Sequence, residues 1–385
     1  MKITYARAIY NERERELVDQ VFSSGWLSGG KFTSEFEQKL ANWWGVKYAI
    51  SVNSGSSANF IAMQALEVKG EVITPGLSFP TTISAIVYQN CTPVFIDSDE
   101  NLLIDLDQLE EAITPDTKVV MFAHTLGNVC DMDRLMRIVK KHDLRLIEDC
   151  CDAVSSKWKG QKVGTFGDLA TVSFYPAHHM TTFGEGGAIL TNSRELYKKC
   201  VSIRDWGRDC TCKWDESGCP VRFANPPFDH KYYYTRLGMN LKMTEAQAAF
   251  GVAQLDRLDG FVQKRIENYE YLKERVNLNV VSKIQNATVS WFALPILAKE
   301  EKEPIMSYLE GKGIQTRAIF AGNITRHPAY QKIGRTIKHN DKSDLKVTDK
   351  IMKSGFFVGV HPALSKNDLD FMAKEINASS SCSHS

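Results

Sequence analysis

Two adjacent histidines are the residues of this chain that best suit proton transfer. His178 and His179 follow a candidate strand at 170–174 and precede the turn Gly184-Glu-Gly-Gly. An imidazole gains and loses a proton near neutral pH and can act as a general base. A histidine pair on an interior turn is also a common hydrogen-bonded packing feature, so the surrounding motifs must separate the two interpretations.

A small polar stretch and a carboxylate at a strand end offer binding chemistry for an anion and a ring. Asn53-Ser-Gly-Ser-Ser opens a helix-like segment, so its amides and hydroxyls favour a phosphate, although plain helix capping would use the same residues. Asp149 ends a candidate strand and can pair with a protonated ring nitrogen of a ligand or cap the next helix. Phe79 can stack on the same ring or belong to the core.

Four cysteines are candidates for a metal site. Cys210, Cys212 and Cys219 lie close together in the sequence, and Cys151 lies far upstream. Four thiolates suit a 2Fe-2S cluster or a structural zinc, and ligand count alone ranks zinc slightly ahead. Cys150 is an alternative to Cys151 as the upstream ligand, although on an extended segment the two side chains point to opposite faces.

The composition of the 385-residue chain excludes several classes of partner and compartment. Its 47 basic and 46 acidic side chains give a formal charge of +1, which provides no reason to expect nucleic acid or an anionic membrane as partner. The sequence has no apolar run of about 18 residues and no signal-peptide pattern, so we predict a soluble cytoplasmic protein. Nine cysteines in such a chain indicate free thiols and metal ligands rather than a disulfide scaffold.

The periodicity of apolar residues predicts an α/β fold. Short apolar runs alternate with amphipathic stretches up to residue 255, as a mainly parallel sheet covered by helices requires. Several predicted strands end in polar residues, which suits ligand sites at the carboxyl ends of parallel strands. The predicted strands are 48–52, 71–74, 92–96, 118–122, 145–148, 170–174 and 188–191, with 288–297, 314–318 and 356–360 in a smaller domain.

The same pattern divides the chain into two domains and a tail. We expect a large domain at 1–255 with an inserted cysteine-rich loop at about 205–235, and a small C-terminal domain at 256–376. A long connecting helix is predicted at 244–275. Residues 377–385 are small and polar, which predicts a disordered tail.

Taken together, these motifs resemble a known family over nearly the whole chain. Phe79, the Ser/Gly stretch, Asp149, Ser173 and the glycine turn are similar in order and spacing to the sugar aminotransferases, which are fold-type I pyridoxal-phosphate enzymes. Within that family the chain resembles the lysine-free branch, the nucleotide-sugar 3-dehydrases, and above all those that act on CDP-4-keto-6-deoxyglucose. The motifs that carry this closer likeness are Ala123-His-Thr-Leu-Gly-Asn, Ile147-Glu-Asp-Cys-Cys-Asp, Ser173-Phe-Tyr-Pro-Ala-His-His, Asp205-Trp-Gly-Arg-Asp-Cys and Asp229-His-Lys-Tyr.

The resemblance gives the histidine pair a role. The family has its cofactor lysine at a fixed distance after the serine of this motif, which corresponds to His178 here. Counting back from the glycine turn leaves His179 possible, because the chain has one extra residue near Phe183. No lysine lies between Lys162 and Lys198, and an imidazole cannot form the Schiff base of a lysine amine. The resemblance therefore implies proton transfer by His178 on a cofactor held without a covalent bond.

The resemblance also implies a fold and a cofactor site. It implies a fold-type I aminotransferase, with a mixed, mainly parallel seven-stranded sheet, a smaller α+β C-terminal domain and bound pyridoxamine 5'-phosphate. Asp149 would pair with the ring nitrogen, and Asn240 would reach the cofactor phosphate of a neighbouring subunit, which implies a homodimer. The implied cofactor-binding residues are Gly55, Ser56, Ser57, Phe79, Asp149, Asp152, Ser173 and Asn240.

The lysine-free branch implies a reaction for deoxysugar biosynthesis. Cys151 with Cys210, Cys212 and Cys219 would hold a 2Fe-2S cluster, although the last spacing is one residue shorter than expected. The reaction removes the 3-hydroxyl of an NDP-4-keto-6-deoxyhexose, with CDP favoured and dTDP or GDP open. His178 would take a proton, and an NAD(P)H-dependent flavin and iron-sulfur reductase would supply electrons through the cluster.

Three alternatives use the same fold. A cluster-free 3-dehydratase of the GDP-sugar type, in which glutamate regenerates the cofactor, would share His178 but have no use for four placed cysteines. An ordinary aminotransferase would need a lysine near position 178. A zinc-stabilised scaffold without catalysis would keep the fold but would not need Asp149 and the phosphate stretch.

Overall fold

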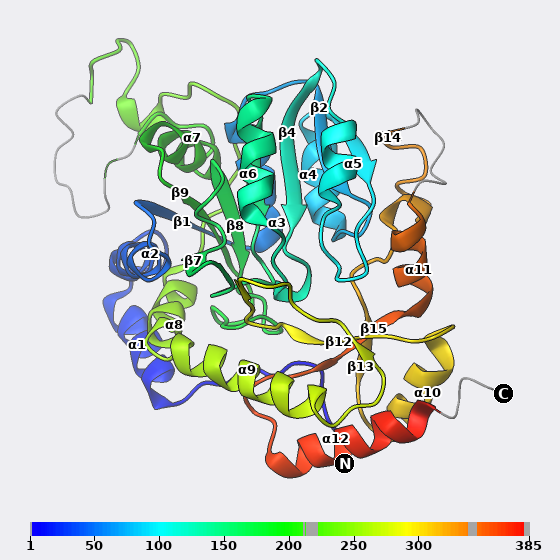
Figure 1. Ribbon diagram of the computed structural model, residues 1–385. Coiled ribbons are helices and arrows are strands. Elements are labelled where there is room, and N and C mark those ends of the chain that lie inside the picture. Colours follow the sequence, from blue (N-terminus) through cyan, green and yellow to red (C-terminus); the bar gives the residue numbers. More distant parts are fainter. Residues whose placement is uncertain (1, 211, 213–221, 338–344, 381–385) are drawn as a thin grey trace.

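The computed structural model describes residues 2–210, 212, 222–337 and 345–380. A large mixed sheet is covered on both faces by helices, and a smaller sheet with its own helices lies beside it (Figure 1). This is the α/β architecture that the alternation of apolar runs and amphipathic stretches predicts. Within the described part of the chain, every helix is too short or too polar to cross a membrane.

The large sheet consists of β1 (Tyr48–Val52), β2 (Glu71–Pro75), β3 (Thr92–Ile96), β4 (Thr117–Ala123), β5 (Arg145–Asp149), β8 (Leu169–Ser173), β9 (Gly187–Thr191) and β14 (Arg335–Thr336). Their order is β1-β9-β8-β5-β4-β2-β3-β14. β9 runs antiparallel to both of its neighbours, and the other pairs are parallel. All seven predicted strands are confirmed, and β14 adds an edge strand that is too short for periodicity to reveal.

The helices around this sheet are α1 (Glu12–Ser24), α2 (Lys31–Trp44), α3 (Gly55–Ala65), α4 (Pro80–Tyr88), α5 (Leu106–Glu111), α6 (Met132–Lys141), α7 (Arg194–Arg204) and α8 (Glu245–Leu255), with short helices η1 (Thr125–Gly127) and η2 (His230–Tyr232). The side chains of β4 show why helices pack on both faces of the large sheet. Val119 and Met121 pack with α3, α4 and α7, whereas Val120 and Phe122 belong to the core with α2, α6 and α8. Successive side chains of a strand point to opposite faces, so an apolar strand requires helices on both sides.

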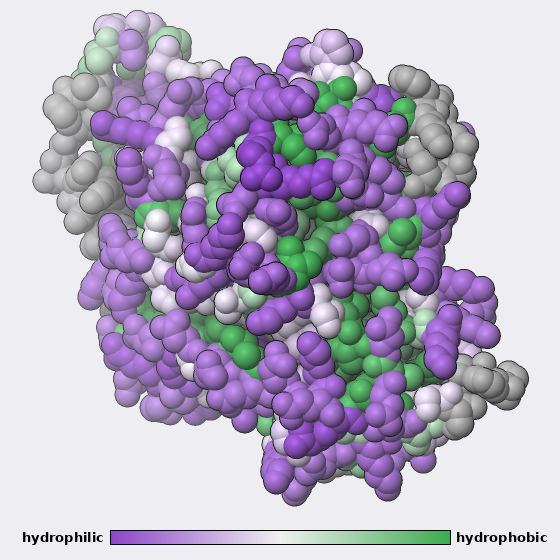
Figure 2. Space-filling view, in the orientation of Figure 1, coloured by the Kyte–Doolittle hydropathy of each residue, from purple (hydrophilic) through white to green (hydrophobic). Residues whose placement is uncertain are grey.

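The smaller sheet has the order β10-β12-β15-β13 and antiparallel pairing. In Figure 2 most of the surface is hydrophilic, and apolar side chains show over this smaller sheet. A separate short sheet pairs β6 with β7 and β11. The remaining elements are β6 (Lys157–Trp158), β7 (Gln161–Lys162), β10 (Asn279–Val280), β11 (Ala287–Thr288), β12 (Ala293–Leu297), β13 (Thr316–Ala318), β15 (Gly355–Gly359), α9 (Leu258–Lys273), α10 (Glu303–Gly311), η3 (Ile324–Arg326), α11 (Lys346–Ser354) and α12 (Lys366–Ser379).

Three predicted elements are wrong in detail. The helix predicted at 244–275 is divided into α8 and α9 by a turn at 256–257. At this junction Arg257 pairs with the buried carboxylate of Glu14, a tertiary contact that helical periodicity does not show. The strand predicted at 288–297 is two strands that belong to different sheets, β11 and β12. The predicted tail begins at 377, but α12 continues to Ser379, and residues 381–385 lie outside the described chain. The domain boundary at 255 stays a prediction.

Gly187 at the start of β9 determines how closely the sheet approaches the Ser/Gly stretch. A Cβ there would lie 2.5 Å from the carbonyl carbon of Ser54 and 2.6 Å from the nitrogen of Gly55, which are backbone atoms. We expect Gly187→Ala to lower the free energy of unfolding by about 1–3 kcal/mol, because the backbone must move. Urea unfolding followed by circular dichroism measures the change, and an unchanged midpoint would contradict this close approach.

Gly260 on α9 provides the matched control. Nothing lies within 4 Å of a Cβ built at this position. Alanine has fewer unfolded conformations than glycine and a higher helix propensity, so Gly260→Ala should raise the free energy of unfolding by about 0.4–1 kcal/mol. If the change in the free energy of unfolding has opposite signs in the two variants, the loss in Gly187→Ala comes from the local clash and not from a general effect of adding a methyl group.

Candidate active site

A cavity of about 390 Å³ lies at the carboxyl ends of the parallel strands. Residues that follow β1, β5 and β8 reach it together, since these strands end at the same edge of the sheet. Residues of the smaller sheet, with Arg317 and Phe357 among them, line the other side. Of the predicted site residues, the cavity wall includes Gly55, Ser56, Phe79, Asp149, Cys151, Asp152, Ser173 and His178.

The Ser/Gly stretch forms the N-terminus of α3, with Ser54 as its cap. The Ser54 hydroxyl accepts the Ser57 N–H at 3.1 Å, and the two hydroxyl oxygens lie 2.9 Å apart. Ser56 lines the cavity, and a Cβ at Gly55 would come within 2.8 Å of the Ser173 Cβ. Gly55 thus lets Ser173 and Cys151 approach the start of α3 closely, and the cavity wall here combines hydroxyl groups with a helix N-terminus, a set that fits a phosphate. Ser57 is predicted to join them, but in this structure its hydroxyl is used within the cap.

Asp149 is a buried carboxylate with a donor for each oxygen. Its Oδ2 accepts from Asn59 Nδ2 at 2.9 Å and from Thr82 Oγ1 at 2.8 Å, and its Oδ1 accepts the Cys151 N–H at 3.1 Å. Thr171 Oγ1 donates to Asn59 Oδ1 at 2.6 Å and so orients the Asn59 amide. A fixed carboxylate in the cavity wall fits a protonated ring nitrogen. Asn59 and Thr82 carry no sequence signal of this role, because they meet Asp149 only in the fold.

The two adjacent histidines face different surroundings. His178 lines the cavity, and its Nδ1 lies 3.4 Å from Asp152 Oδ1. His179 is buried away from this cavity, with its Nε2 3.0 Å from the carbonyl oxygen of Ser290. Burial, and then the neighbouring Arg265, lower the pKa of His179 well below its ordinary value. His178 is therefore the histidine in position for proton transfer with a ligand in the cavity.

A buried arginine from α9 holds the backbone of the histidine pair. Arg265 is 2% exposed and donates to the carbonyl oxygens of Ala177 at 3.2 Å, His178 at 2.8 Å and Phe292 at 2.8 Å. Burial lowers the pKa of this guanidinium to about 10, so it remains charged at neutral pH. A buried cation needs such partners, and by taking them Arg265 fixes the backbone that carries His178. The sequence contains no motif for this residue.

Aromatic rings and one arginine line the mouth of the cavity. Phe79 is half exposed and meets Phe320 edge to face, with ring centroids 6.2 Å apart. The guanidinium of Arg317 lies over the ring of Tyr5, 4.3 Å from its centroid. An exposed phenyl ring suits stacking on a planar ligand, and a guanidinium suits an anionic substrate.

Asn240 does not line the cavity of its own chain. It is exposed, forms a backbone bridge with Asp205 and accepts a hydrogen bond from Lys242 Nζ at 2.7 Å. Its role at the cofactor phosphate of a neighbouring subunit stays a prediction.

The described residues do not assemble the predicted 2Fe-2S site. Cys151 lines the cavity, whereas Cys210 and Cys212 form a group with His230. Cys219 lies outside the described residues. The sequence spacing brings Cys210 and Cys212 together, but the position of Cys151 depends on β5, which carries it into the cavity wall.

Cys150 and Cys151 have different neighbours. Cys150 is fully buried beside Glu148 and His124, and Cys151 reaches the cavity. This agrees with the expectation that successive side chains point to opposite faces. Burial raises the pKa of both thiols well above the ordinary value.

Comparisons with known proteins identify the family. Residues 8–377 match the family model described as the DegT/DnrJ/EryC1/StrS aminotransferase family. The chain belongs to this family. Membership confirms the resemblance to sugar aminotransferases over nearly the whole chain.

Two relatives and one solved structure illustrate what the chain is similar to within the DegT/DnrJ/EryC1/StrS family. The chain is 40% identical to the lipopolysaccharide biosynthesis protein RfbH of Salmonella typhimurium, over 95% of this chain and 89% of that protein. It is 37% identical to dTDP-4-dehydro-2,6-dideoxy-D-glucose 3-dehydratase of Saccharopolyspora spinosa, over 96% and 84%. A solved structure of GDP-4-keto-6-deoxymannose-3-dehydratase with a trapped PLP-glutamate geminal diamine is 26% identical, with a TM-score of 0.87 over 97% of this chain and all of that one. The last comparison confirms the predicted fold.

The lowered pKa of His179 predicts how stability depends on pH. Its folded-state pKa lies below the ordinary value of 6.5, so the unfolded chain takes up this proton first as the pH falls. The stabilisation is complete above about pH 6.5 and is lost progressively below it. We expect His179→Gln to lose less stability than the wild type between about pH 7.5 and 5.5, as measured by urea midpoints.

Two other histidines sharpen this test. His361, whose pKa burial lowers to about 4, adds a slope of the same sign, so the variant should show a reduced slope rather than none. His142→Gln, at a partly exposed position, should behave as the wild type. An equal loss of stability in His179→Gln and the wild type would contradict the assigned role of His179.

Proposed function

We propose that the protein is a nucleotide-sugar 3-dehydratase that uses pyridoxamine phosphate held without a covalent bond. The observation that carries this proposal is His178 in the wall of the cavity that Asp149 also lines, where an aminotransferase would hold a lysine. The substrate class is an NDP-4-keto-6-deoxyhexose, which loses its 3-hydroxyl group. Two similar proteins named as 3-dehydratases, one for a dTDP sugar and one for a GDP sugar, support it.

The cavity residues fit the cofactor. Asp149 would pair with the ring nitrogen and Phe79 would stack on the ring, while Ser56, Ser173 and the N-terminus of α3 would hold the phosphate. When bound, pyridoxamine phosphate supplies an amine that condenses with the 4-keto group and a ring that accepts electrons. Asn240 would complete the phosphate site of a neighbouring subunit, so the active form would be a homodimer.

His178 is the general base of the proposed reaction. Asp152 Oδ1 lies 3.4 Å from Nδ1 of His178, and a small movement that closes this contact to a hydrogen bond would hold a proton on Nδ1 and leave Nε2 free to accept one. Arg265 holds the His178 carbonyl and so keeps the ring at the cavity wall. His178 would accept a proton that the reaction releases and could return it to the 3-hydroxyl, which would then leave as water. Arg317 is the side chain that would meet the diphosphate.

Removal of the hydroxyl replaces a C–O bond with a C–H bond and therefore needs two electrons. Glutamate is the electron donor in this proposal. It is oxidised to 2-oxoglutarate and ammonia, and the oxygen atom that the sugar loses balances the one that 2-oxoglutarate gains. The PLP-glutamate species trapped in the solved 3-dehydratase supports this choice. The similarity to a lipopolysaccharide biosynthesis protein suggests a deoxysugar for a surface polysaccharide.

A second candidate keeps the reaction but changes the source of electrons. An NAD(P)H-dependent reductase would deliver them through a 2Fe-2S cluster, and glutamate would not be consumed. The observation in its favour is the close approach of Cys210 and Cys212. CDP would then be the favoured nucleotide, as the sequence resemblance implies.

Product analysis tests the proposed function. The purified protein is incubated with pyridoxal phosphate, glutamate and the 4-keto-6-deoxy sugars of CDP, dTDP and GDP in turn. We expect one of the sugars to lose an oxygen atom at carbon 3, with equal amounts of 2-oxoglutarate and ammonia. A 4-amino sugar would show an aminotransferase and contradict the proposal, whereas deoxygenation that requires a reductase and no glutamate would favour the second candidate.

The base is tested by replacing His178. We expect His178→Lys to slow 3-deoxygenation by at least about 100-fold, because a well-placed general base contributes that much or more. The new lysine should form a Schiff base that is visible in the absorbance spectrum. His142→Gln, remote from the cavity, should keep wild-type activity. Unchanged deoxygenation in His178→Lys would show that another residue is the base.

A further inference from the structure

The N-terminal segment runs from the smaller sheet to α8 and passes the cavity on the way. The Ile3 N–H donates to the Gly313 carbonyl at 2.8 Å, which pairs the segment with the chain just before β13. Further along, the Ile9 carbonyl accepts from Gln254 Nε2 of α8 at 2.8 Å. Tyr5 lies between these two attachments and lines the cavity.

The backbone at Tyr5 lies directly against β15. A Cβ built at Gly359 would come within 2.3 Å of the Tyr5 carbonyl oxygen and 2.8 Å of its Cα, so a side chain there would displace the segment. The Tyr5 N–H donates to Gln315 Oε1 at 3.3 Å, and the Thr4 carbonyl oxygen lies 3.0 Å from Nε2 of His361. These contacts hold the main chain of Tyr5 in one place at the cavity wall.

The Tyr5 ring packs on one face of the smaller sheet. Arg317 of β13 and Phe357 of β15 are directly opposite each other in the antiparallel pairing, so their side chains lie on the same face. The Tyr5 ring meets the Phe357 ring edge to face, with centroids 6.3 Å apart, and the Arg317 guanidinium lies 4.3 Å from the Tyr5 centroid. All three residues line the cavity. Phe357 therefore fixes the Tyr5 ring where it supports the guanidinium.

Arg317 brings a positive charge to the wall of the cavity. In the chain that the structure describes, it is paired with no carboxylate, and its partners are the Tyr5 ring and the Thr316 carbonyl, to which Nη1 donates at 2.7 Å. Stacking on an aromatic face leaves further N–H groups of the guanidinium available to an anion. A freely rotating arginine side chain loses conformational freedom when it binds, so support by a ring lowers that cost.

We propose that Tyr5 is a positioning residue that holds the Arg317 guanidinium in place for the diphosphate of a nucleotide sugar. The identity of the ligand rests on the proposed function, whereas the arrangement of the two side chains does not. A guanidinium binds a phosphate with two parallel N–H···O bonds only in a suitable orientation, and the Tyr5 ring limits the orientations it can take. Tyr5 acts through Arg317, so it contributes to the affinity for substrate and not to proton transfer.

Binding of nucleoside diphosphates to the cofactor-loaded protein tests this role without turnover. CDP, dTDP, GDP and inorganic pyrophosphate are titrated in turn by isothermal calorimetry, and the variants are compared with the ligand that the wild type binds best. We expect Tyr5→Leu to weaken binding about 3–30-fold, the range that a cation–π contact contributes. Tyr5→Phe keeps the face of the ring and should stay within about twofold of the wild type.

A double-mutant cycle shows whether Tyr5 acts through Arg317. Arg317→Gln should weaken binding by itself, and Tyr5→Leu should then cost little more, because the guanidinium that the ring supports is gone. An equal loss from Tyr5→Leu with and without the guanidinium would overturn the proposal, since the ring would then act on the ligand or on the fold directly.

Tyr271 on α9 provides a matched control. The Arg275 guanidinium lies 3.7 Å from the centroid of the Tyr271 ring, which is the same kind of contact away from the cavity. Tyr271→Leu should bind the nucleoside diphosphate as the wild type does. The absorbance spectrum of the cofactor and the urea midpoint of each variant show whether the cofactor site and the fold are intact.

Failure of this role and failure of the proposed function give different results. If no sugar is 3-deoxygenated but Tyr5→Leu still weakens binding through Arg317, the positioning role stands and the reaction is a different one. If deoxygenation occurs and Tyr5→Leu raises neither the dissociation constant nor the KM for the sugar, the positioning role is wrong. A wild type that binds none of the four ligands would also overturn it.

Turnover adds a second readout where the proposed function holds. In Tyr5→Leu the KM for the sugar should rise while kcat changes by less than about twofold, because the diphosphate contact is the same in the bound substrate and in the transition state. A fall in kcat at unchanged KM would contradict a role in positioning Arg317 for substrate binding.

Discussion

The buried carboxylate of Asp149 is the interaction on which the rest of the site depends. A carboxylate removed from water is costly unless donors surround it, and here they come from α3, α4 and the backbone of Cys151. Satisfying that carboxylate draws the first turns of α3 against the end of β5. The same helix terminus presents Gly55 and Ser56 to the cavity, so one network positions both the proposed partner of a ring nitrogen and the proposed phosphate site.

The two adjacent histidines have different surroundings and therefore different chemical properties. His178 faces the cavity with an anion, Asp152, beside it, whereas His179 faces a carbonyl oxygen in the interior with a cation, Arg265, nearby. Arg265 donates to the carbonyl of His178, and after burial it is the second cause of the lowered pKa of His179, so one buried guanidinium affects both residues. A histidine cannot form the Schiff base of a lysine, but its imidazole can accept and donate a proton.

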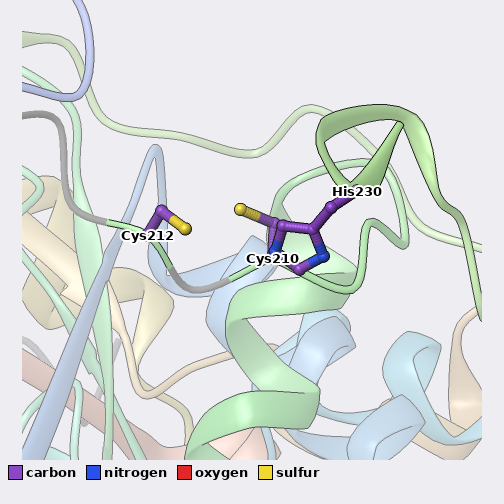
Figure 3. A group of neighbouring side chains, drawn as sticks. All are labelled: Cys210, Cys212 and His230. Atoms are coloured by element: carbon purple, nitrogen blue, oxygen red, sulfur yellow. The ribbon is translucent and has the colours of Figure 1, made fainter. Parts of the chain in front are cut away.

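The cavity and the group of Cys210, Cys212 and His230 are separate features of the molecule. Asp149, Ser173 and His178 line the cavity, and Cys151 lies within its wall. Cys210, Cys212 and His230 come together where the backbone segments around 207–210 and 230–235 pair (Figure 3).

The sequence by itself determined the fold class, the seven main strands, and Asp149 and the Ser/Gly stretch as candidates, because strand periodicity and residues at strand ends are local signals. Ser173 and the preference for His178 over His179 came from the resemblance to a family. Neither established which histidine faces the cavity, the hydrogen bonds of the Ser57 hydroxyl with Asn53 and Ser54, or the break between α8 and α9. No sequence signal predicted the contacts of Asn59, Thr82, Arg265 and His230. Each of these depends on side chains that meet across distant segments, and only the tertiary structure brings those segments together.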